Sequence, residues 1–232
     1  MIVAIDGPAA SGKGRMVELL SKKLNLDTLD TGAIYRVITI ALRDLGFDYN
    51  QMDDDKVKEL DEILNSLDIE VEKSIAENKR SFKYYLNGVD VTKRLRDKDT
   101  SSHVSYVSSI IPIRLFATEY TRKYAEGKNI IMDGRDIGTY VFPNADVKIY
   151  LTADLEERAK RRYNQNIETG SDHVNFNEIL ENLKSRDYND MYNKEIGALK
   201  QAKDAILVDN TGQNEEETLE VLINIIKEKM NV

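Results

Sequence analysis

GPAASGKGR, residues 7–15, carries two glycines separated by four residues, with Lys13 directly after the second glycine. The apolar run at residues 2–5 predicts a strand before this stretch, and the spacing of the apolar residues within 16–24 predicts a helix after it. Strand, glycine loop and helix in this order are typical of a phosphate-binding loop, whose backbone N–H groups and lysine surround phosphate oxygens. The alternative is a glycine-rich turn that binds nothing. We therefore predict an ATP site made of Gly7, Pro8, Ala9, Ala10, Ser11, Gly12, Lys13, Gly14 and Arg15.

The end of this loop departs from the usual form. Such loops usually place Ser or Thr directly after the lysine, whereas Gly14 and Arg15 follow Lys13 in this chain. One interpretation has the long Arg15 side chain reaching a phosphate from outside the loop. The other, which we favour, has Arg15 in solvent, because a cation at a helix N-terminus is mildly unfavourable. On that interpretation the backbone N–H groups and Lys13 hold the nucleotide.

The composition limits the class of protein. The 232 residues suffice for one large domain or one domain with an insert, and 41% hydrophobic residues suffice for a packed core. There is no Cys, which excludes disulfides and thiolate metal sites, and no apolar run approaches the ~20 residues of a membrane span. A net charge of -8 disfavours general nucleic-acid binding. We expect a cytoplasmic protein with no membrane or nucleic-acid partner, since its N-terminus enters a strand without a signal-like stretch.

Apolar runs and turn signals predict an α/β fold. Five short runs predict the strands of a parallel sheet, with ligands at the carboxyl ends of the strands: 2–6, 27–30, 129–133, 147–152 and 205–209. Residues 66–95 break this pattern, because apolar and polar residues alternate around the hairpin signal Asn87-Gly88. We predict a small antiparallel insert of three strands there. The C-terminus is expected to end in a helix, with Glu215 to Glu217 in its first turn and Lys227 and Lys229 in its last turn. Its buried stripe consists of Leu219, Leu222, Ile223, Ile226 and Met230.

Four stretches together resemble the bacterial-type cytidylate kinases of the P-loop nucleoside monophosphate kinase superfamily, over nearly the whole chain. They are IDGPAASGKG at 5–14, DTGAIYR at 30–36, DGRDIGTYVFPNADVKIYL at 133–151 and RDYNDM at 186–191; LNGVDVT at 86–92 is similar to the insert of that family. The resemblance implies a three-layer P-loop fold with a five-stranded parallel sheet, and transfer of the γ-phosphoryl group of ATP to CMP or dCMP with Mg²⁺. It also implies a monomer with a core at 1–65 and 96–232, a helical lid at about 154–185, and a nucleotide-binding insert at 66–95.

The resemblance further implies the residues of the acceptor site. Arg114 and Ser105 would recognise the cytosine edge together with Asp136, whose carboxylate accepts from the exocyclic amine that uracil lacks. Arg36 and Arg135 would hold the phosphate of the acceptor, and Arg186 with Asp190 would bind its ribose. Thr31 would approach the acceptor nucleotide, and Tyr35 would pack beside it. Structural alternatives stay open for several of these residues. Thr31 starts a helix, Tyr35 fits a core, and Arg186 with Asp190 fits a plain intrahelical ion pair.

For the transfer step, the resemblance implies Lys13, Arg135 and a lid that closes arginines over the phosphate. The candidates Arg158, Arg161 and Arg162 lie three and four residues apart and therefore share a helix face. The alternative is a solvated face with the pairs Asp154–Arg158 and Glu157–Arg161. Asp133 would orient Mg²⁺ through water, or else Asp133-Gly134 is only a turn.

Two departures bear on catalytic efficiency. Besides Arg15, the chain has Asn193 where the family carries a phosphate-binding arginine, and Lys194 next to it is a point charge and no guanidinium fork. A nucleotide-binding relative with weakened transferase activity is therefore the second hypothesis. A P-loop switch or transport ATPase is disfavoured, because the guanine-binding signature is absent from the sequence. His103 and His173 sit in no motif, and we interpret both as surface or packing residues.

Overall fold

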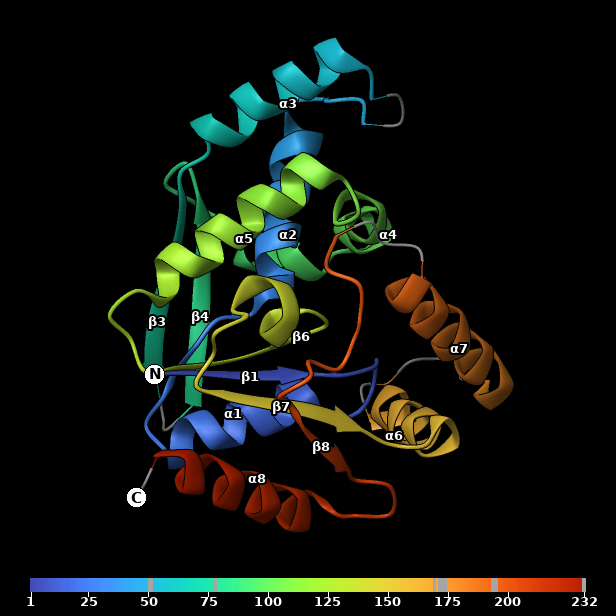
Figure 1. Ribbon diagram of the computed structural model, residues 1–232. Coiled ribbons are helices and arrows are strands. Elements are labelled where there is room, and N and C mark those ends of the chain that lie inside the picture. The colour runs from blue at the N-terminus through green and yellow to red at the C-terminus, as the bar shows by residue number, and fades with distance from the viewer. Residues whose placement is uncertain (50–51, 77–78, 169, 171–174, 193–195, 231–232) are drawn as a thin grey trace. The chain divides into compact units, whose positions relative to one another are not determined.

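The computed structural model describes residues 1–49, 52–76, 79–168, 170, 175–192 and 196–230, and Figure 1 shows its ribbon. The chain divides into two compact units. One consists of Met1–Asp30 with Thr121–Val232, and the other of Thr31–Tyr120. Each unit has its own β-sheet. Three residues discussed from the sequence, His173, Asn193 and Lys194, lie outside the described residues.

The first unit is built on a parallel sheet in the order β2-β6-β1-β7-β8. Its strands are β1 (Ile2–Asp6), β2 (Asp27–Thr28), β6 (Ile130–Gly134), β7 (Val147–Thr152) and β8 (Ile206–Asp209). The chain passes from β6 on one side of β1 to β7 on the other side. Such a switch point opens a crevice at the carboxyl ends of the strands, where ligands of parallel sheets bind. Asp6, the last residue of β1, marks this end of the sheet.

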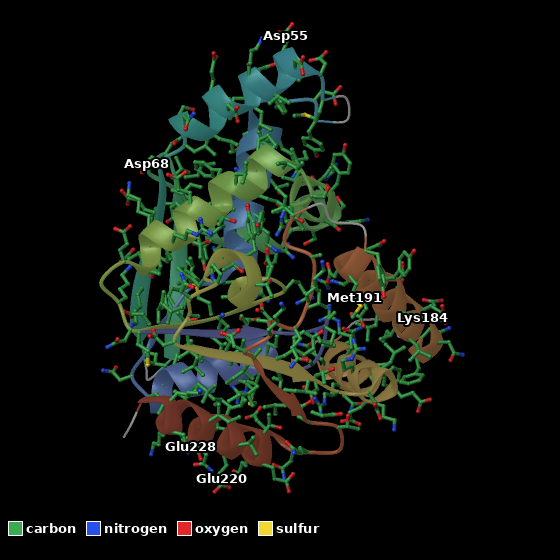
Figure 2. The ribbon with its side chains drawn as sticks, in the orientation of Figure 1. Asp55, Asp68, Lys184, Met191, Glu220 and Glu228 are labelled. Carbon is green, nitrogen blue, oxygen red and sulfur yellow. The ribbon has the colours of Figure 1, made fainter. Side chains whose placement is uncertain are left out.

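Two helices pack on one side of this sheet, α1 (Lys13–Lys23) and α8 (Glu215–Met230) (Figure 1). Their apolar faces join the β1 and β7 side chains in one core, which includes Met16, Leu20, Leu222 and Ile226. The stripe predicted for the last helix is buried at Leu219, Leu222 and Ile226 and partly buried at Ile223. Glu220 and Glu228 lie on the outward face of α8, as Figure 2 shows. An amphipathic pattern therefore places α8 on the sheet.

Further elements lie near the carboxyl end of the sheet. Helices α6 (Leu155–Glu168) and α7 (Phe176–Tyr192) pack against each other. Their small core contains Ala159, Ile179 and Leu183 and also Ala9 of the glycine loop. A single π-helical turn, η2 (Ile137–Val141), follows β6 and packs on β1 and β6.

The second unit holds a three-stranded antiparallel sheet in the order β3-β4-β5. Its elements are α2 (Thr31–Asp44), α3 (Asp54–Ser66), β3 (Ile69–Ala76), β4 (Lys79–Leu86), β5 (Val89–Asp90), η1 (Thr92–Arg96), α4 (Lys98–Val107) and α5 (Ile111–Ala125), of which α5 continues into the first unit. Asn87 and Gly88 have φ of 50° and 77°, as a tight hairpin turn requires. Val89 is 62% exposed, since β5 is a two-residue strand at the edge of this sheet.

The structure confirms the predicted α/β fold with a five-stranded parallel sheet and a small antiparallel sheet. The second strand was predicted too long: it ends at Thr28, because Asp30 is exposed and the chain turns into α2 at Thr31. The division into a core, a lid and an insert at 66–95 stays a prediction. Among the described helices, none has the length and apolar character needed to cross a membrane.

Candidate nucleotide-binding site

The glycine loop connects β1 to α1 in a conformation that only certain residues can adopt. Gly7 has φ of 152°, and a Cβ there would lie 2.0 Å from the carbonyl oxygen of Leu151, so no other residue fits. Gly12 precedes the first residue of α1 with φ of 91°. Ala10 also has a positive φ, 59°, although it carries a Cβ and the left-handed region is disfavoured for such residues. The free N–H groups of the first turn of α1 follow directly, as in a phosphate-binding loop.

Lys13 is buried within this loop, with 5% of its surface exposed. Its Nζ donates to the carbonyl oxygen of Pro8 at 2.6 Å and to Oγ of Ser11 at 3.3 Å. Burial and then the nearby Arg135 guanidinium lower the pKa of Lys13, while the carboxylate of Asp133 opposes this shift. An arriving phosphate group would compensate both unfavourable effects and favour the charged ammonium.

A pocket of about 600 Å³ opens over the loop and gathers positive charge. It is lined by loop residues, by one acidic side chain, Asp133, and by the basic side chains Lys13, Arg15, Arg135, Arg162 and Arg186. Burial and the neighbouring Arg135 lower the pKa of the Arg186 guanidinium. Cations held this close to one another indicate a site for a multiply charged anion.

A second pocket of about 360 Å³ adjoins the first one and shares Gly12, Arg15, Arg162 and Gln165 with it. Its distinct lining includes Arg161, Asn210 and Gln213. Arg161 donates from Nη1 to Oδ1 of Asn210 at 3.0 Å and from Nη2 to the carbonyl oxygen of Asn210 at 2.8 Å. The planar guanidinium is thereby fixed at the wall of this second pocket.

The three arginines predicted to share a face of the lid helix have different environments. Arg158 is buried, and its guanidinium contacts Ala9, Ala153 and Asp187. Arg161 pairs with Glu157 at 3.1 Å, as the structural alternative proposed, and it also binds Asn210. Asp187, and not Asp154, is the carboxylate that pairs with Arg158. Of the three, only Arg162 lines the pocket over the loop.

Arg135 and Asp190 form a partly buried ion pair. The Nε of Arg135 donates to Oδ2 of Asp190 at 2.6 Å, with 18% and 12% of the two side chains exposed. This pair joins the turn after β6 to α7. The carboxylate of Asp190 therefore lies at the arginine that the resemblance assigns to phosphate.

Asp6 was not predicted as a site residue, although it directly precedes the loop. Its Oδ1 accepts from the backbone N–H of Ile137 at 2.8 Å, and its Oδ2 accepts from that of Gly138 at 2.7 Å. Burial raises the pKa of Asp6 to about 6 despite these two hydrogen bonds. The carboxylate thus fixes η2, whose N-cap is Asp136. Its position as an acidic residue at the end of the first strand, next to the loop, could have indicated Asp6 from the sequence.

Asp133 is the one acidic side chain of the loop pocket, at the carboxyl end of β6. Burial raises its pKa, and the Lys13 ammonium opposes this. A carboxylate oxygen is a suitable Mg²⁺ ligand, and Mg²⁺ usually keeps several waters and needs few protein ligands. Within the described residues, no group of three His, Cys, Asp or Glu side chains gathers as a dedicated metal site. The donor set therefore fits a metal held mainly by nucleotide phosphates.

Arg15 points to the surface and is half exposed. Its Nε and Nη2 donate to the two carboxylate oxygens of Glu215 at 2.8 and 3.0 Å, and its Nη1 donates to Glu18 at 2.9 Å. These two acids supply surface partners for the guanidinium.

Three of the residues assigned to the acceptor in the second unit, Tyr35, Arg36 and Arg114, make the following contacts. Arg36 donates from Nη1 to the carbonyl oxygen of Leu95 at 2.8 Å and to Oγ of Ser101 at 3.1 Å. Arg114 is buried; its Nη1 donates to the carbonyl oxygen of Ser108 at 3.2 Å, and its guanidinium lies 5.9 Å from the centre of the Tyr35 ring.

The other two assigned residues of this unit lie on its helices. Thr31 is the first residue of α2, as its structural alternative predicted. Ser105 is exposed on α4, where its carbonyl oxygen accepts from Oγ of Ser108.

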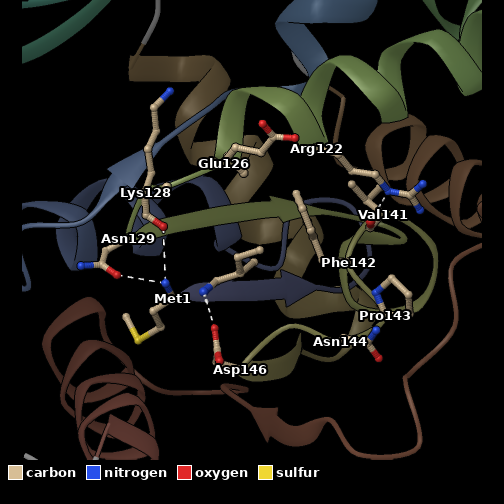
Figure 3. A pocket seen from close by; sticks show the side chains of 13 residues that line it. Met1, Arg122, Glu126, Lys128, Asn129, Val141, Phe142, Pro143, Asn144 and Asp146 are labelled. Carbon is tan, nitrogen blue, oxygen red and sulfur yellow. Dashed lines mark hydrogen bonds between the residues drawn. The ribbon is translucent and has the colours of Figure 1, made fainter.

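Another hollow, of about 740 Å³, lies at the amino ends of the strands (Figure 3). Here Ile2 donates its N–H to Asp146 at 2.6 Å, and Arg122 donates from Nε to the carbonyl oxygen of Val141 at 2.8 Å. The side chains of Asp146 and Arg122 are thus engaged within the protein. Because ligands of parallel sheets bind at the carboxyl ends of the strands, we place the functional site at the glycine loop.

Comparison with known proteins shows the family to which the sequence is similar. The model of the cytidylate kinase family matches residues 3–228. The chain is 43% identical to a cytidylate kinase of Fusobacterium nucleatum over 99% of this chain and 97% of the relative. It is 41% identical to a cytidylate kinase of Leuconostoc mesenteroides, with the same coverage. Among solved structures, an uncharacterized protein from Eubacterium ventriosum superposes with a TM-score of 0.53 at 12% identity, over 98% of each chain, which supports the fold alone.

Proposed function

The chain belongs to the cytidylate kinase family and is a phosphotransferase of that class, and we propose that it transfers the γ-phosphoryl group of ATP to CMP or dCMP at the glycine loop. The observation that carries this assignment is the loop pocket. There a buried lysine, three arginines that reach in from other segments and the start of α1 surround one space. Phosphoryl transfer requires little else of a protein, because positioning and positive charge stabilise a loose transition state.

We assign the donor to the two adjoining pockets. The phosphates of ATP bind the backbone of Gly7–Gly14 and the ammonium of Lys13, and the donor base and ribose occupy the space beside Arg161 and Asn210. The shared lining of the pockets at Gly12 and Gln165 supports one ligand that extends through both. A planar guanidinium held by Asn210 offers a stacking surface for a base.

The transferring phosphate is assigned to Arg135, Arg162 and Arg186. Each of these side chains lines the loop pocket, and they come from the turn after β6, from α6 and from α7. The resemblance implied a ribose contact for Arg186, and its position in the loop pocket supports the phosphate instead. The guanidinium forks match phosphate oxygens and neutralise the charge that develops on them. Asp133 would hold Mg²⁺ through water, and the metal when bound supplies further charge neutralisation at the phosphates.

The acceptor residues proposed in the second unit are Tyr35, Arg36, Ser105 and Arg114. The buried guanidinium of Arg114 next to the Tyr35 ring supports a role in base recognition. In the first unit, Asp136 is buried, and its backbone carbonyl oxygen accepts from the N–H groups of Tyr140 and Val141 in η2, which fixes its position. Asp190 is assigned to the ribose, and Thr31 stays a candidate contact at the start of α2. We also propose that the protein acts as a monomer in the cytoplasm.

The test is a coupled assay of ADP release with CMP, dCMP, UMP and AMP offered separately, each with and without Mg²⁺. We expect Mg²⁺-dependent turnover with CMP and dCMP that far exceeds turnover with UMP or AMP. Equal turnover with all four acceptors would contradict the assignment of the base-recognition residues. ATP binding without turnover on any acceptor would instead favour a nucleotide-binding relative, which is the alternative suggested by Asn193.

A further inference from the structure

Both polar groups of the Ala9 backbone are held by one buried ion pair from outside the loop. The Nη1 of Arg158 donates to the carbonyl oxygen of Ala9 at 3.0 Å and to Oδ2 of Asp187 at 2.7 Å. The N–H of Ala9 donates to the other oxygen, Oδ1, of Asp187 at 3.4 Å. Only 8% of the Arg158 side chain and 14% of the Asp187 side chain are exposed. Arg158 comes from α6 and Asp187 from α7, so side chains of both helices form hydrogen bonds with the same residue of the loop.

Ala9 directly precedes Ala10, whose backbone is strained. Ala10 has φ of 59°, a value that residues with a Cβ rarely adopt. Such a conformation persists only where surrounding contacts fix it. The two contacts to Ala9 are side-chain contacts of this kind, and they act on the backbone that must present its N–H groups to phosphate.

Two arginines of the loop pocket come from the same two helices as this pair. Arg162 lies one helical turn after Arg158 on α6, and Arg186 directly precedes Asp187 on α7. Both Arg162 and Arg186 line the pocket, whereas neither Arg158 nor Asp187 does. The Nε of Arg158 is engaged as well, by the carbonyl oxygen of Ala153 at 2.9 Å. Arg158 is thus arranged to hold protein groups in place.

We propose that Arg158 and Asp187 act together as positioning residues, which set the conformation of the glycine loop and align Arg162 and Arg186 with it. This inference rests on the proposed binding of ATP at the loop. It separates Arg158 from the arginines that touch phosphate. If Arg158 contacted phosphate itself, its carboxylate partner would compete with the nucleotide. If it positions the loop, the partner is needed for tight binding.

Asp187→Asn distinguishes these two roles. Its amide keeps the size of the side chain but removes the charge and one acceptor atom. We expect the Kd of ATP, measured by calorimetric titration far below the Tm, to rise about tenfold, as for loss of a charged hydrogen bond. Arg158→Met should raise the Kd of ATP by a similar factor. The Kd of the double variant should lie within about twofold of the Kd of either single variant, because the pair acts as a unit. Arg158→Lys keeps the charge without the fork and should restore little affinity.

Asp204→Asn is the matched control, because Asp204 also pairs with a buried cation, Lys148, at 2.8 Å but away from the loop. We expect this control to leave the Kd of ATP unchanged. An unchanged or lower Kd in Asp187→Asn, while Arg158→Met weakens binding, would overturn the proposal in favour of direct phosphate contact. Unchanged binding in both variants would overturn it as well. Failure of the wild-type chain to bind ATP would contradict the proposed function instead. If Arg158→Met does not fold, Asp187→Asn alone decides.

Discussion

The Nε of Arg135 lies 2.6 Å from Oδ2 of Asp190, and this bond joins the turn after β6 to α7. Both side chains are mostly buried, so the charge of each depends on the other. The arginine assigned to phosphate therefore has a fixed direction before any substrate binds. A preorganised cation loses little free energy to reorganisation when the phosphate arrives.

Asp190→Asn should impair the acceptor side of the reaction. The amide cannot hold the guanidinium of Arg135 by charge, and it accepts more weakly from a sugar hydroxyl. We expect the KM for CMP to rise about tenfold or more, in line with about 1.5–3 kcal/mol for a charged hydrogen bond, with a smaller change in the KM for ATP. Steady-state kinetics measure both constants. The exposed Glu220→Gln serves as control, and a selective loss of ATP affinity would contradict the assignment.

Arg15→Thr should leave catalysis intact or raise turnover modestly. Arg15 pairs at the surface with Glu18 and Glu215, and all three side chains are about half exposed. Exposed pairs of this kind contribute about 0–1 kcal/mol, so the free energy of unfolding should change by less than that. Thr also supplies a hydroxyl two residues after Lys13, beyond Gly14. A loss of turnover above ~100-fold, or ~2.7 kcal/mol, would show that Arg15 serves the reaction directly.

Asp6 should make the stability depend on pH in an identifiable direction. Burial raises its pKa from 3.8 to about 6, while the nearby Lys13 opposes the shift and Asp136 adds to it. An acid with a raised folded pKa binds its proton more tightly in the native state. Its contribution to the free energy of unfolding therefore grows as the pH falls from about 6 to 3.8 and is lost as the pH rises again.

Comparison with Asp6→Asn isolates this group, because Asn does not titrate. Urea unfolding at pH 7 and pH 4 gives the difference in stability between wild type and variant. We expect wild type to gain about 2 kcal/mol relative to the variant on going from pH 7 to pH 4. No gain, or a gain in the opposite direction, would show that the carboxylate is ionised with an ordinary pKa in the fold.

Arg114→Met should weaken the acceptor site for CMP. If the buried guanidinium donates to the cytosine carbonyl, its removal leaves that acceptor unpaired. We expect kcat/KM for CMP to fall about 100-fold, within the range for a buried charged hydrogen bond. Uracil carries the same carbonyl, so the low kcat/KM for UMP should fall in proportion, because the choice between the two bases rests on Asp136 and the exocyclic amine. An unchanged kcat/KM for CMP would remove Arg114 from base recognition.

The sequence predicted the parallel sheet because its strands are short runs of β-branched and apolar residues next to turn signals. It also predicted the loop, since Gly7 and Gly12 are required by the backbone itself. The hairpin in the second unit followed from Asn87-Gly88 for the same reason. Local chemistry decides these features, and local patterns therefore reveal them.

Other features depend on partners that are distant in the sequence. In the sequence, residues 156–162 look like a solvated helix face. In the structure Arg158 is buried against its carboxylate partner Asp187, which lies 29 residues away in the sequence. The turn η2 is fixed by Asp6, which lies 131 residues before Ile137. Neither pairing leaves a periodic signal, so the individual roles of the α6 arginines could not be separated before the structure was known.

Lys13→Ala tests the central claim most directly, because the buried ammonium is the positive charge inside the glycine loop. The measurement is kcat for CDP formation from ATP and CMP, in a variant whose circular dichroism and Tm show that it is folded. We predict a loss of at least ~1,000-fold, or ~4 kcal/mol of transition-state stabilisation. Turnover within a few-fold of wild type would contradict the assignment of the loop as the site of phosphoryl transfer.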